Sequence, residues 1–404
     1  MSNAVMTSGV RVAKPNTRPE NPRFSPGPTT KFPGWKLEML SDVPAGRSHR
    51  SGICKERLQE VLDRSRALLG IPDDYRIGIM PGSDTGAFEA AMWCLLDNKR
   101  GVDVLAWESF GQDWAEDILK ELKLDNTRKI EADYGDLPDL SKVDFSRDVV
   151  FTWNGTTSGV RVPNDDWIPD NRGGLVMADA TSGAYAMDIP WNKIDVLTYS
   201  WQKVMGGEGQ HGMLILSPRA VARLENHRPS WPVPKLFRLT EKGKLIEGIF
   251  KAATINTPSM IAVEDHLQGL KWAESIGGLK ALIALAEANT KALTDWADGS
   301  DWVGMLCADR ANQSPTSGCL QFTDAWAAAL DTKGQNALVK RMLALLEEED
   351  ACLDIAGYAK APPGLRLWTG GTVELANLKA AFPWLDWAFA TAKAELQPDG
   401  SAAA

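Results

Sequence analysis

The feature that most constrains the fold is an alternation, between residues 55 and 216, of short apolar runs with amphipathic or polar segments. Within each apolar run, polar and apolar residues do not alternate, so both faces of each predicted strand should be buried. Buried strands that alternate with helices predict an α/β fold, with helices on both faces of a mostly parallel sheet of the seven-stranded type. The expected strands are Arg76–Met80, Val102–Trp107, Asp148–Trp153, Gly174–Ala178, Ile194–Tyr199 and Gly212–Leu216, and the expected helices are Lys55–Leu69, Ala87–Asp97 and Gly111–Leu122.

The character of the chain changes after this region, where two long helices are expected at Pro258–Ile276 and Leu279–Ala297. A chain of 404 residues is long enough for two domains. We expect an extended N-terminal arm at residues 1–35, a large α/β domain at 36–290 and a small α+β domain at 291–404. Further strands are expected at Trp302–Cys307, Gly318–Phe322, near Leu353 and at Leu365–Trp368, with helices at Gly334–Glu348 and Val373–Leu396.

The N-terminal arm contains six prolines between Pro15 and Pro33, which disfavour a helix and keep the backbone extended. The arm is either a disordered tail or a segment that packs over a partner subunit or over the mouth of the active site. The loop Val43–Gly52 follows, with two arginines and a histidine. Such a loop is either merely solvated or binds an anion through the arginine forks.

Composition excludes several classes of protein. The chain has 44 basic and 53 acidic residues and a net charge of −9, which argues against a nucleic-acid surface. Its five cysteines are scattered without a C-x-x-C pair, so neither a metal site nor a disulfide framework is indicated. No apolar run reaches the length of a membrane span, and the N-terminus lacks the apolar segment of a signal peptide. We expect a cytoplasmic protein with reduced thiols.

A lysine at the end of a buried strand is the most unusual feature of the sequence. The apolar run Ile194–Tyr199 leads to Lys203 and then to a glycine-rich bend. Burying an ammonium is costly, whereas a lysine bound as an imine to pyridoxal phosphate (PLP) is not an ammonium. The alternatives are an ordinary surface lysine and a dinucleotide site at Gly207, Gly209 and Gly212. A dinucleotide site needs a helix after the glycines, where a strand is expected.

Other segments that follow predicted strands could complete a PLP site. Ser83, Asp84 and Thr85 begin a helix, where free backbone N–H groups and the helix dipole attract an anion, although they could be simple caps. Asp179 follows a strand directly, and a buried carboxylate there needs a positive partner such as a pyridinium nitrogen. Phe110 could stack on a flat ring or belong to the core. The carboxyl ends of successive strands are where open α/β sheets bind ligands.

The sequence resembles the class V aminotransferases of PLP fold type I, and most closely the phosphoserine aminotransferase family. The resemblance extends from about Lys14 to about Leu396. Its most specific segments are Asn21–Pro28, Gly46–Arg50, the pair Gln202-Lys203 and Asn256–Pro258.

The resemblance implies roles for individual residues toward the cofactor. Lys203 forms the imine and later acts as the base, Asp179 pairs with the pyridine nitrogen, and Phe110 stacks on the ring. Thr156 bonds the ring hydroxyl or its near edge. The cofactor phosphate is held by Ser83, Asp84, Thr85 and Gln202, together with Asn256 and Thr257 of the neighbouring subunit of an obligate homodimer. The glycine-rich bend then leaves room for a backbone that passes close to the cofactor and the adjoining subunit.

The resemblance also implies a substrate. His49 and Arg50 match the pair that binds the substrate phosphate, and Arg366 matches the arginine that binds the substrate carboxylate. The implied reaction exchanges an amino group between phosphoserine and 2-oxoglutarate, with glutamate as a product, in serine biosynthesis. The family's arginine in the cofactor-phosphate turn is missing here, and Tyr358-Ala-Lys360 stands where many members have a His-Arg pair. Lys360 or Arg47 could substitute.

Three alternatives are less well supported. A serine–glyoxylate or alanine–glyoxylate type of aminotransferase would not need His49 and Arg50, because its substrates carry no phosphate. A PLP lyase such as a cysteine desulfurase needs a reactive thiol, whereas Cys319 lies in an apolar strand. A regulator without the cofactor would not need the set Asp179, Gln202 and Lys203. His211 could line the pocket, but a structural role is favoured.

Overall fold

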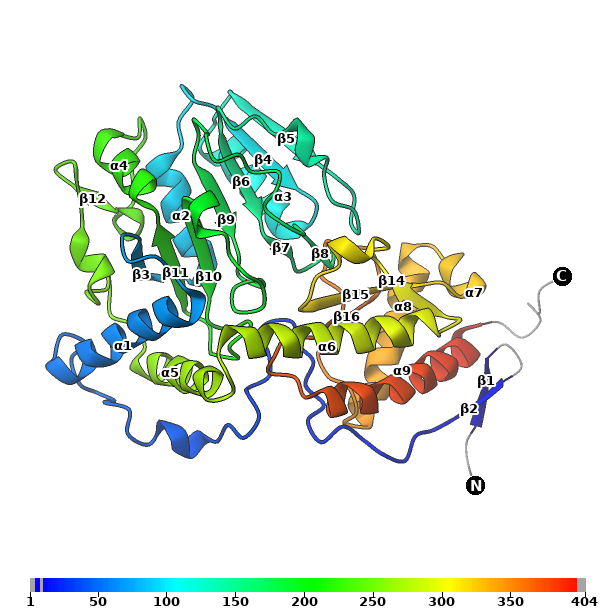
Figure 1. Ribbon diagram of the computed structural model, residues 1–404. Coiled ribbons are helices and arrows are strands. Elements are labelled where there is room, and N and C mark those ends of the chain that lie inside the picture. The colour runs from blue at the N-terminus through cyan, green and yellow to red at the C-terminus, as the bar shows by residue number, and fades with distance from the viewer. Residues whose placement is uncertain (1–3, 8–9, 398–404) are drawn as a thin grey trace.

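The computed structural model describes residues 4–7 and 10–397. Its central feature is a seven-stranded sheet in the order β3-β11-β10-β9-β6-β4-β5 (Figure 1). Strand β11 runs antiparallel to both of its neighbours, and the pairs from β10 to β5 are parallel. The predicted α/β class and mostly parallel sheet are therefore confirmed. The strands are β3 (Arg76–Pro81), β4 (Val102–Ala106), β5 (Thr127–Glu131), β6 (Asp148–Thr152), β9 (Val176–Asp179), β10 (Val196–Ser200) and β11 (His211–Leu216).

Helices cover both faces of this sheet. Side chains of α2, α3 and α4 pack with one set of strand residues, and those of α1 and α5 pack with the other set. The six strands other than β5 supply both sets, because alternate side chains point to opposite faces. The helices are α1 (Gly52–Leu69), α2 (Ser83–Leu95), α3 (Ser109–Glu116) with a π-helical turn at Asp117–Glu121, α4 (Pro218–Asn226) and α5 (Met260–Ser275).

Two elements of the large sheet region differ from the expectation. Strand β5 was not predicted, because its sequence Thr-Arg-Lys-Ile-Glu is polar and half exposed at the edge of the sheet. Helix α2 begins at Ser83 instead of Ala87, so the expected turn already forms the first helical turn. Short elements add to the connections: β7 (Asn154–Gly155), β8 (Val160–Arg161), β12 (Thr240–Glu241), β13 (Lys244–Leu245) and 3-10 turns at Leu37–Leu40, Leu140–Lys142, Trp191–Lys193, Lys235–Phe237, Glu247–Phe250 and Arg310–Asn312.

The C-terminal part is built on a three-stranded antiparallel sheet. The prediction of a strand near Leu353 is wrong, since this residue forms only an isolated bridge with Arg23. The expected domain boundary at residue 290 falls inside α6, and the division into domains stays a prediction. The elements are α6 (Leu279–Asp298), β14 (Val303–Met305), β15 (Ser317–Phe322), α7 (Ala325–Ala328), α8 (Thr332–Glu348), β16 (Leu365–Trp368) and α9 (Leu375–Leu396).

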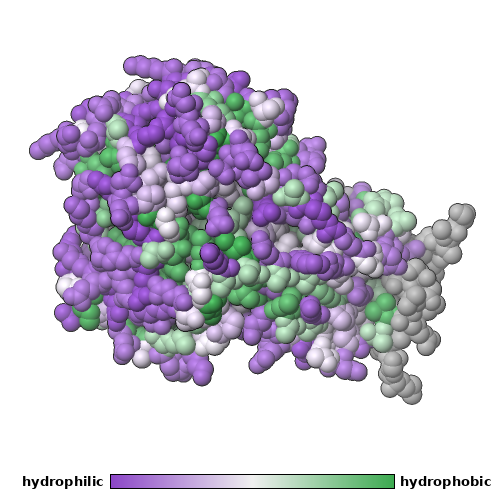
Figure 2. Space-filling view, in the orientation of Figure 1, coloured by the Kyte–Doolittle hydropathy of each residue, from purple (hydrophilic) through white to green (hydrophobic). Residues whose placement is uncertain are grey.

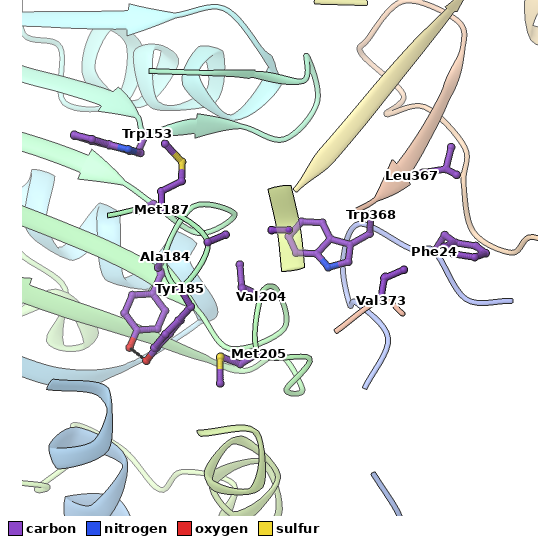
Figure 3. Packing of buried hydrophobic residues seen from close by; sticks show 14 of the residues in the cluster. Phe24, Trp153, Ala184, Tyr185, Met187, Val204, Met205, Leu367, Trp368 and Val373 are labelled. Carbon is purple, nitrogen blue, oxygen red and sulfur yellow. Dashed lines mark hydrogen bonds between the residues drawn. The ribbon is translucent and has the colours of Figure 1, made fainter. Parts of the chain in front are cut away.

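The two sheet regions share one hydrophobic core. Polar side chains cover most of the face seen in Figure 2, and apolar ones gather in its middle, where the two regions meet. Below the surface, Trp368 of β16 lies between Val204 on one side and Phe24 and Val373 on the other (Figure 3). Burying an aromatic side chain of this size contributes on the order of 3 kcal/mol. The junction is therefore packed, and the small sheet is held in place beside the carboxyl ends of the large one.

The described residues of the N-terminal arm, 4–7 and 10–35, form a hairpin and then pack against the C-terminal region. Strands β1 (Ala4–Thr7) and β2 (Val10–Ala13) pair as a hairpin that lies beside α9 (Figure 1), a pairing that was not predicted. Further along, Phe24 is buried, its N–H donates to the Leu353 carbonyl, and its carbonyl accepts from the Trp368 N–H. The arm is thus held to the C-terminal region before it reaches the large sheet.

A stack of three buried rings supports the segment that follows β10. The Trp201 ring lies between His211 of β11, at a centroid distance of 4.5 Å, and His266 of α5, at 4.6 Å. Burial lowers the pKa of His211 to about 4 and that of His266 to about 3. The positive charge of Lys31 and the neighbouring His211 act in the same direction on His266. Both imidazoles are therefore neutral in the folded protein near pH 7.

This stack predicts acid sensitivity. Below pH 6.5 the unfolded chain binds protons at His266 that the folded chain does not, so stability falls as the pH falls. Urea unfolding should show a loss of about 2 kcal/mol from His266 alone between about pH 7 and about pH 5. His266→Phe keeps a stacked ring without a titrating group and should flatten this slope. Equal slopes in the two proteins would contradict the assignment.

Candidate functional site

A cavity of about 420 Å³ lies at the carboxyl ends of β3, β4, β6, β9 and β10. This volume suits a small organic ligand. Its position is the one that open α/β sheets use for ligands. Eight of the predicted site residues line it together: Ser83, Asp84, Thr85, Phe110, Thr156, Asp179, Gln202 and Lys203.

Lys203 is buried in this cavity, and the N-terminal arm holds it. Its Nζ donates a hydrogen bond of 2.5 Å to the Pro26 carbonyl, and its own carbonyl accepts from the Thr29 hydroxyl at 2.5 Å. The Thr29 N–H donates to the Gln202 carbonyl at 3.0 Å. Burial lowers the pKa of Lys203 to about 8, helped by the charge of Arg366 and opposed by Asp179 and Glu108. The amine can therefore exchange a proton close to neutral pH.

The arm is anchored beside the cavity by one buried carboxylate. Asp265 of α5 accepts from Lys31 Nζ at 2.8 Å, from Trp35 Nε1 at 3.0 Å and from the Glu208 N–H at 3.0 Å. It joins the arm, α5 and the glycine-rich bend at one point. Gly27 and Pro28 of the arm line the cavity, and the interpretation in which the arm packs over the mouth of the site stays a prediction.

The glycines of the bend make room for the chain's own backbone. A Cβ at Gly206 would lie 2.6 Å from the Thr30 carbonyl oxygen of the arm. At Gly207 it would lie 2.9 Å from the Trp201 carbonyl oxygen, and at Gly212 it would lie 2.1 Å from the Ser83 carbonyl oxygen. Within one chain the close approaches are thus to the arm, to Trp201 and to the start of α2, and the expected approach to the cofactor and the adjoining subunit stays a prediction. The strand β11 that follows also excludes the dinucleotide fingerprint.

Asp179, the last residue of β9, presents a well-supported carboxylate to the cavity. Its Oδ1 accepts from the Thr181 N–H at 2.9 Å, and its Oδ2 accepts from Trp114 Nε1 at 3.2 Å. Two donors stabilise the ionised form of a buried carboxyl. Its pairing with a cationic atom of a ligand stays a prediction.

The turn at the start of α2 differs in detail from the expectation. The N–H groups of Gly82 and Ser83 donate to the Gln210 carbonyl, and that of Asp84 donates to the Ser200 hydroxyl at 3.0 Å. These donors are therefore not free for an anion. Ser83 also has a φ of 61°, an unfavourable backbone conformation that often marks a functional site.

Hydroxyl and amide groups remain at the cavity wall near this turn. The Gln202 Nε2 donates to the Ser83 hydroxyl at 3.0 Å, and Thr85 and Ser200 line the same wall. Such groups can bind the oxygens of a phosphate. The predicted anion site therefore rests on side chains more than on the backbone of the helix.

Phe110 and Thr156 also line the cavity. The Phe110 ring contacts the Tyr358 ring of the C-terminal region, with a distance of 5.5 Å between the ring centroids. The Thr156 hydroxyl donates to the Ser182 hydroxyl at 2.6 Å, and Ser182 also lines the cavity. A flat ligand between these residues would have an aromatic face on one side and hydroxyls at its edge.

Sequence reasoning missed Glu108, a fully buried carboxyl at the cavity wall. It accepts from the Gly111 N–H at 2.7 Å and from the Thr157 hydroxyl at 2.7 Å. Burial raises its pKa to about 7 in spite of these bonds. The signal was present in the sequence, because Glu108 follows the strand β4 in the same way that Asp179 ends β9.

Five predicted residues lie outside the cavity wall. His49 and Arg50 belong to the loop before α1, and Asn256 and Thr257 are exposed before α5. Arg366, on β16, stacks on the Tyr358 ring at 5.6 Å and is close enough to lower the pKa of Lys203. One chain therefore brings Arg366 near the site but not the other four.

Two remaining predictions concern Lys360 and Cys319. Lys360 pairs with Asp113 of α3 at 2.6 Å, a contact between the C-terminal region and the large sheet region. Burial raises the pKa of the Cys319 thiol to about 12, so it is not a nucleophile at neutral pH. This supports its structural role and disfavours a desulfurase.

Two further properties concern the described residues 4–7 and 10–397. No three His, Cys, Asp or Glu side chains among them are arranged to hold a metal ion. None of their helices combines the length and the hydrophobicity that crossing a membrane requires.

Comparison with known proteins identifies relatives over nearly the whole chain. No protein-family model matches it. A phosphoserine aminotransferase from Methanosarcina barkeri is 54% identical over 376 residues, which are 93% of this chain and 99% of that relative.

Solved structures show the same fold. A phosphoserine aminotransferase from Cytophaga hutchinsonii has a TM-score of 0.76 and 20% identity, covering 91% of this chain and 99% of that one. A PLP-bound phosphoserine aminotransferase from Trichomonas vaginalis has a TM-score of 0.72 and 17% identity, covering 91% of this chain and 100% of that one. The matched architecture is that of the fold type I enzymes.

The geometry predicts that Gly27 controls the position of Lys203. A Cβ at Gly27 would lie 2.6 Å from Lys203 Nζ and 3.0 Å from its Cε, so Gly27→Ala should displace the lysine. Only a flexible side chain must move, so the melting temperature should change little. Reaction of the amine with added PLP, followed by absorbance, should slow at least about tenfold.

The matched control is Gly209→Ala. Gly209 also lines the cavity, but a Cβ there would meet no atom within 4 Å. This variant should react like the parent protein. Equal slowing in both variants would mean that the cavity wall in general, and not the contact with Lys203, sets the rate.

Proposed function

The chain belongs to the phosphoserine aminotransferase family, and from this premise we propose the reaction and the residues that carry it. The amino group passes between O-phospho-L-serine and 2-oxoglutarate, giving 3-phosphohydroxypyruvate and glutamate, with PLP as cofactor. The observation that carries the proposal is the meeting of the buried Lys203 amine and the Asp179 carboxylate in one cavity. The five cysteines are free and buried, which suits the proposed cytoplasmic location.

The residues at the cavity fit PLP in charge and shape. The Asp179 carboxylate would pair with the ring nitrogen, and Lys203 would hold the cofactor covalently through its amine. Phe110 would face the ring, and Thr156 with Ser182 would meet its hydroxyl edge. The phosphate would be held by Ser83, Thr85, Ser200 and Gln202, and by Asn256 and Thr257 of the second subunit.

The reaction then depends on proton transfer by Lys203. Bound PLP supplies an electron-withdrawing ring that stabilises negative charge at the substrate Cα. Asp179 keeps the ring nitrogen protonated, which strengthens that effect. Because its pKa is about 8, the Lys203 amine can take the proton from the substrate Cα, and it would deliver that proton to the former aldehyde carbon of the cofactor in the same half-reaction. The arm excludes water at the Pro26–Pro28 side of the cavity.

Substrate binding requires a second copy of the chain. Arg366 would bind the substrate carboxylate from the same chain as Lys203, since its charge already acts on that lysine. His49 and Arg50 do not reach the cavity of their own chain, and we propose that they bind the substrate phosphate across a homodimer. Exposed apolar side chains near them, Leu37, Ile53 and Ile261, favour such an interface.

Subunit complementation tests this arrangement. Lys203→Ala alone should show no transamination, and Arg50→Gln should raise the KM for phosphoserine at least about tenfold with a smaller effect on glutamate. Dimers formed from equal amounts of the two variants should recover about a quarter of the native activity. About half of the dimers are mixed in a random assembly, and each mixed dimer has one intact site.

The control is a mixture of Lys203→Ala with Arg366→Gln. These two residues serve the same site from the same chain, so no mixed dimer contains an intact site and no activity should return. Recovery with Arg366→Gln, or none with Arg50→Gln, would reject the proposed division of the site between subunits.

A further inference from the structure

Two carboxyl groups, Asp84 and Asp179, meet at one wall of the cavity, and their surroundings are unequal. Asp179 accepts two hydrogen bonds, from the Thr181 N–H and from Trp114 Nε1. Neither carboxyl oxygen of Asp84 accepts a hydrogen bond from any described residue, and both are inaccessible to solvent. No lysine, arginine or histidine of the described chain forms an ion pair with Asp84.

Two buried carboxylates side by side cannot both remain ionised without a large cost in free energy. The proton should therefore stay on the group without donors, which is Asp84. Burial and the negative charge of Asp179 both raise the pKa of Asp84 well above its ordinary value. The hydroxyls of Thr181 and Thr198 oppose this shift, but neither forms a hydrogen bond of normal geometry with the carboxyl.

The role of a simple helix cap does not explain Asp84. It lies in the first turn of α2, where the helix dipole favours an anion. The N-cap residue is Gly82, and the Asp84 oxygens accept no hydrogen bond from the N–H groups of the turn, those of Gly82, Ser83 and Asp84 being bonded elsewhere. The dipole effect is small beside the cost of burying a carboxylate with no donor.

The other charged groups around the cavity do not change this assignment. Lys203 and Glu108 line the same cavity from the segments after β10 and β4. The Lys203 amine donates to the Pro26 carbonyl, and Glu108 is bonded to Gly111 and Thr157. His211 of β11, which bridges Ser83, is buried and uncharged near pH 7.

We propose that Asp84 is a positioning residue. Its carboxyl group stays protonated and donates a hydrogen bond to the Asp179 carboxylate. The inference rests on the proposed PLP-dependent function. Asp179 is then the single anion that faces the cofactor's ring nitrogen, and the hydrogen bond from Asp84 fixes its orientation. A neutral Asp84 also places no second negative charge beside the cofactor phosphate in the cradle formed by Ser83, Thr85 and Gln202.

The test compares PLP affinity in Asp84→Asn and Asp84→Ala by equilibrium dialysis of the full-length protein. Near pH 7 the asparagine variant should match the native dissociation constant within about threefold, because its amide is neutral and still donates to Asp179. The alanine variant should bind PLP about tenfold or more weakly, because the hydrogen bond to a charged group is lost. As the pH is raised, the native protein should lose affinity relative to Asp84→Asn, because ionisation of Asp84 would remove its hydrogen bond to Asp179.

Glu89→Gln is the matched control, a carboxyl on the same helix that does not line the cavity, and it should follow the native protein at every pH. Three results would overturn the proposal. Tighter binding by Asp84→Asn near pH 7 would mean that Asp84 is ionised. Equal weakening in Asp84→Asn and Asp84→Ala would mean that a neutral donor of the same shape cannot replace the carboxyl, so Asp84 would not act as a neutral hydrogen-bond donor. Failure of the native protein to bind PLP would instead reject the proposed function, and this inference with it.

Discussion

The structure depends on keeping a lysine amine buried at the end of a strand. Lys203 has no carboxylate in direct contact, and its Nζ is held by the Pro26 carbonyl of the arm. Burial makes a charged ammonium costly and therefore lowers the pKa of Lys203 to about 8. An amine with a pKa near neutral pH can both take up and release a proton. The arm, the glycine-rich bend and the Trp201 stack all serve to hold this residue in place.

Much of this could be predicted from the sequence. The carboxyl ends of parallel strands lie at one edge of a sheet, so the order of strands was enough to place Asp179, Phe110 and Lys203 together. The predicted fold and family are confirmed by the fold of the chain and by a relative at 54% identity. The site residues were found because each is a polar or aromatic residue directly after an apolar run.

The rest could not be predicted because it depends on contacts between distant segments. The arm reaches Lys203 across 177 residues, and no local pattern near Pro26 reveals that contact. Strand β5 was missed because an exposed edge strand carries no apolar run. The unequal surroundings of Asp84 and Asp179 depend in part on Trp114 of α3, a contact that the sequence around either aspartate does not show. His49 and Arg50 fall outside any single-chain cavity, and their proposed role needs a second subunit.

The central claim is that this cavity transfers the amino group of phosphoserine. Its most direct test is the first half-reaction alone, followed by the absorbance of the PLP-loaded protein after mixing with phosphoserine, serine or alanine. The account predicts conversion of the bound cofactor by phosphoserine at a rate at least about a hundredfold above those with serine and alanine, since only phosphoserine engages the phosphate-binding residues. Equal rates with the three amino acids, or none with phosphoserine, would contradict it.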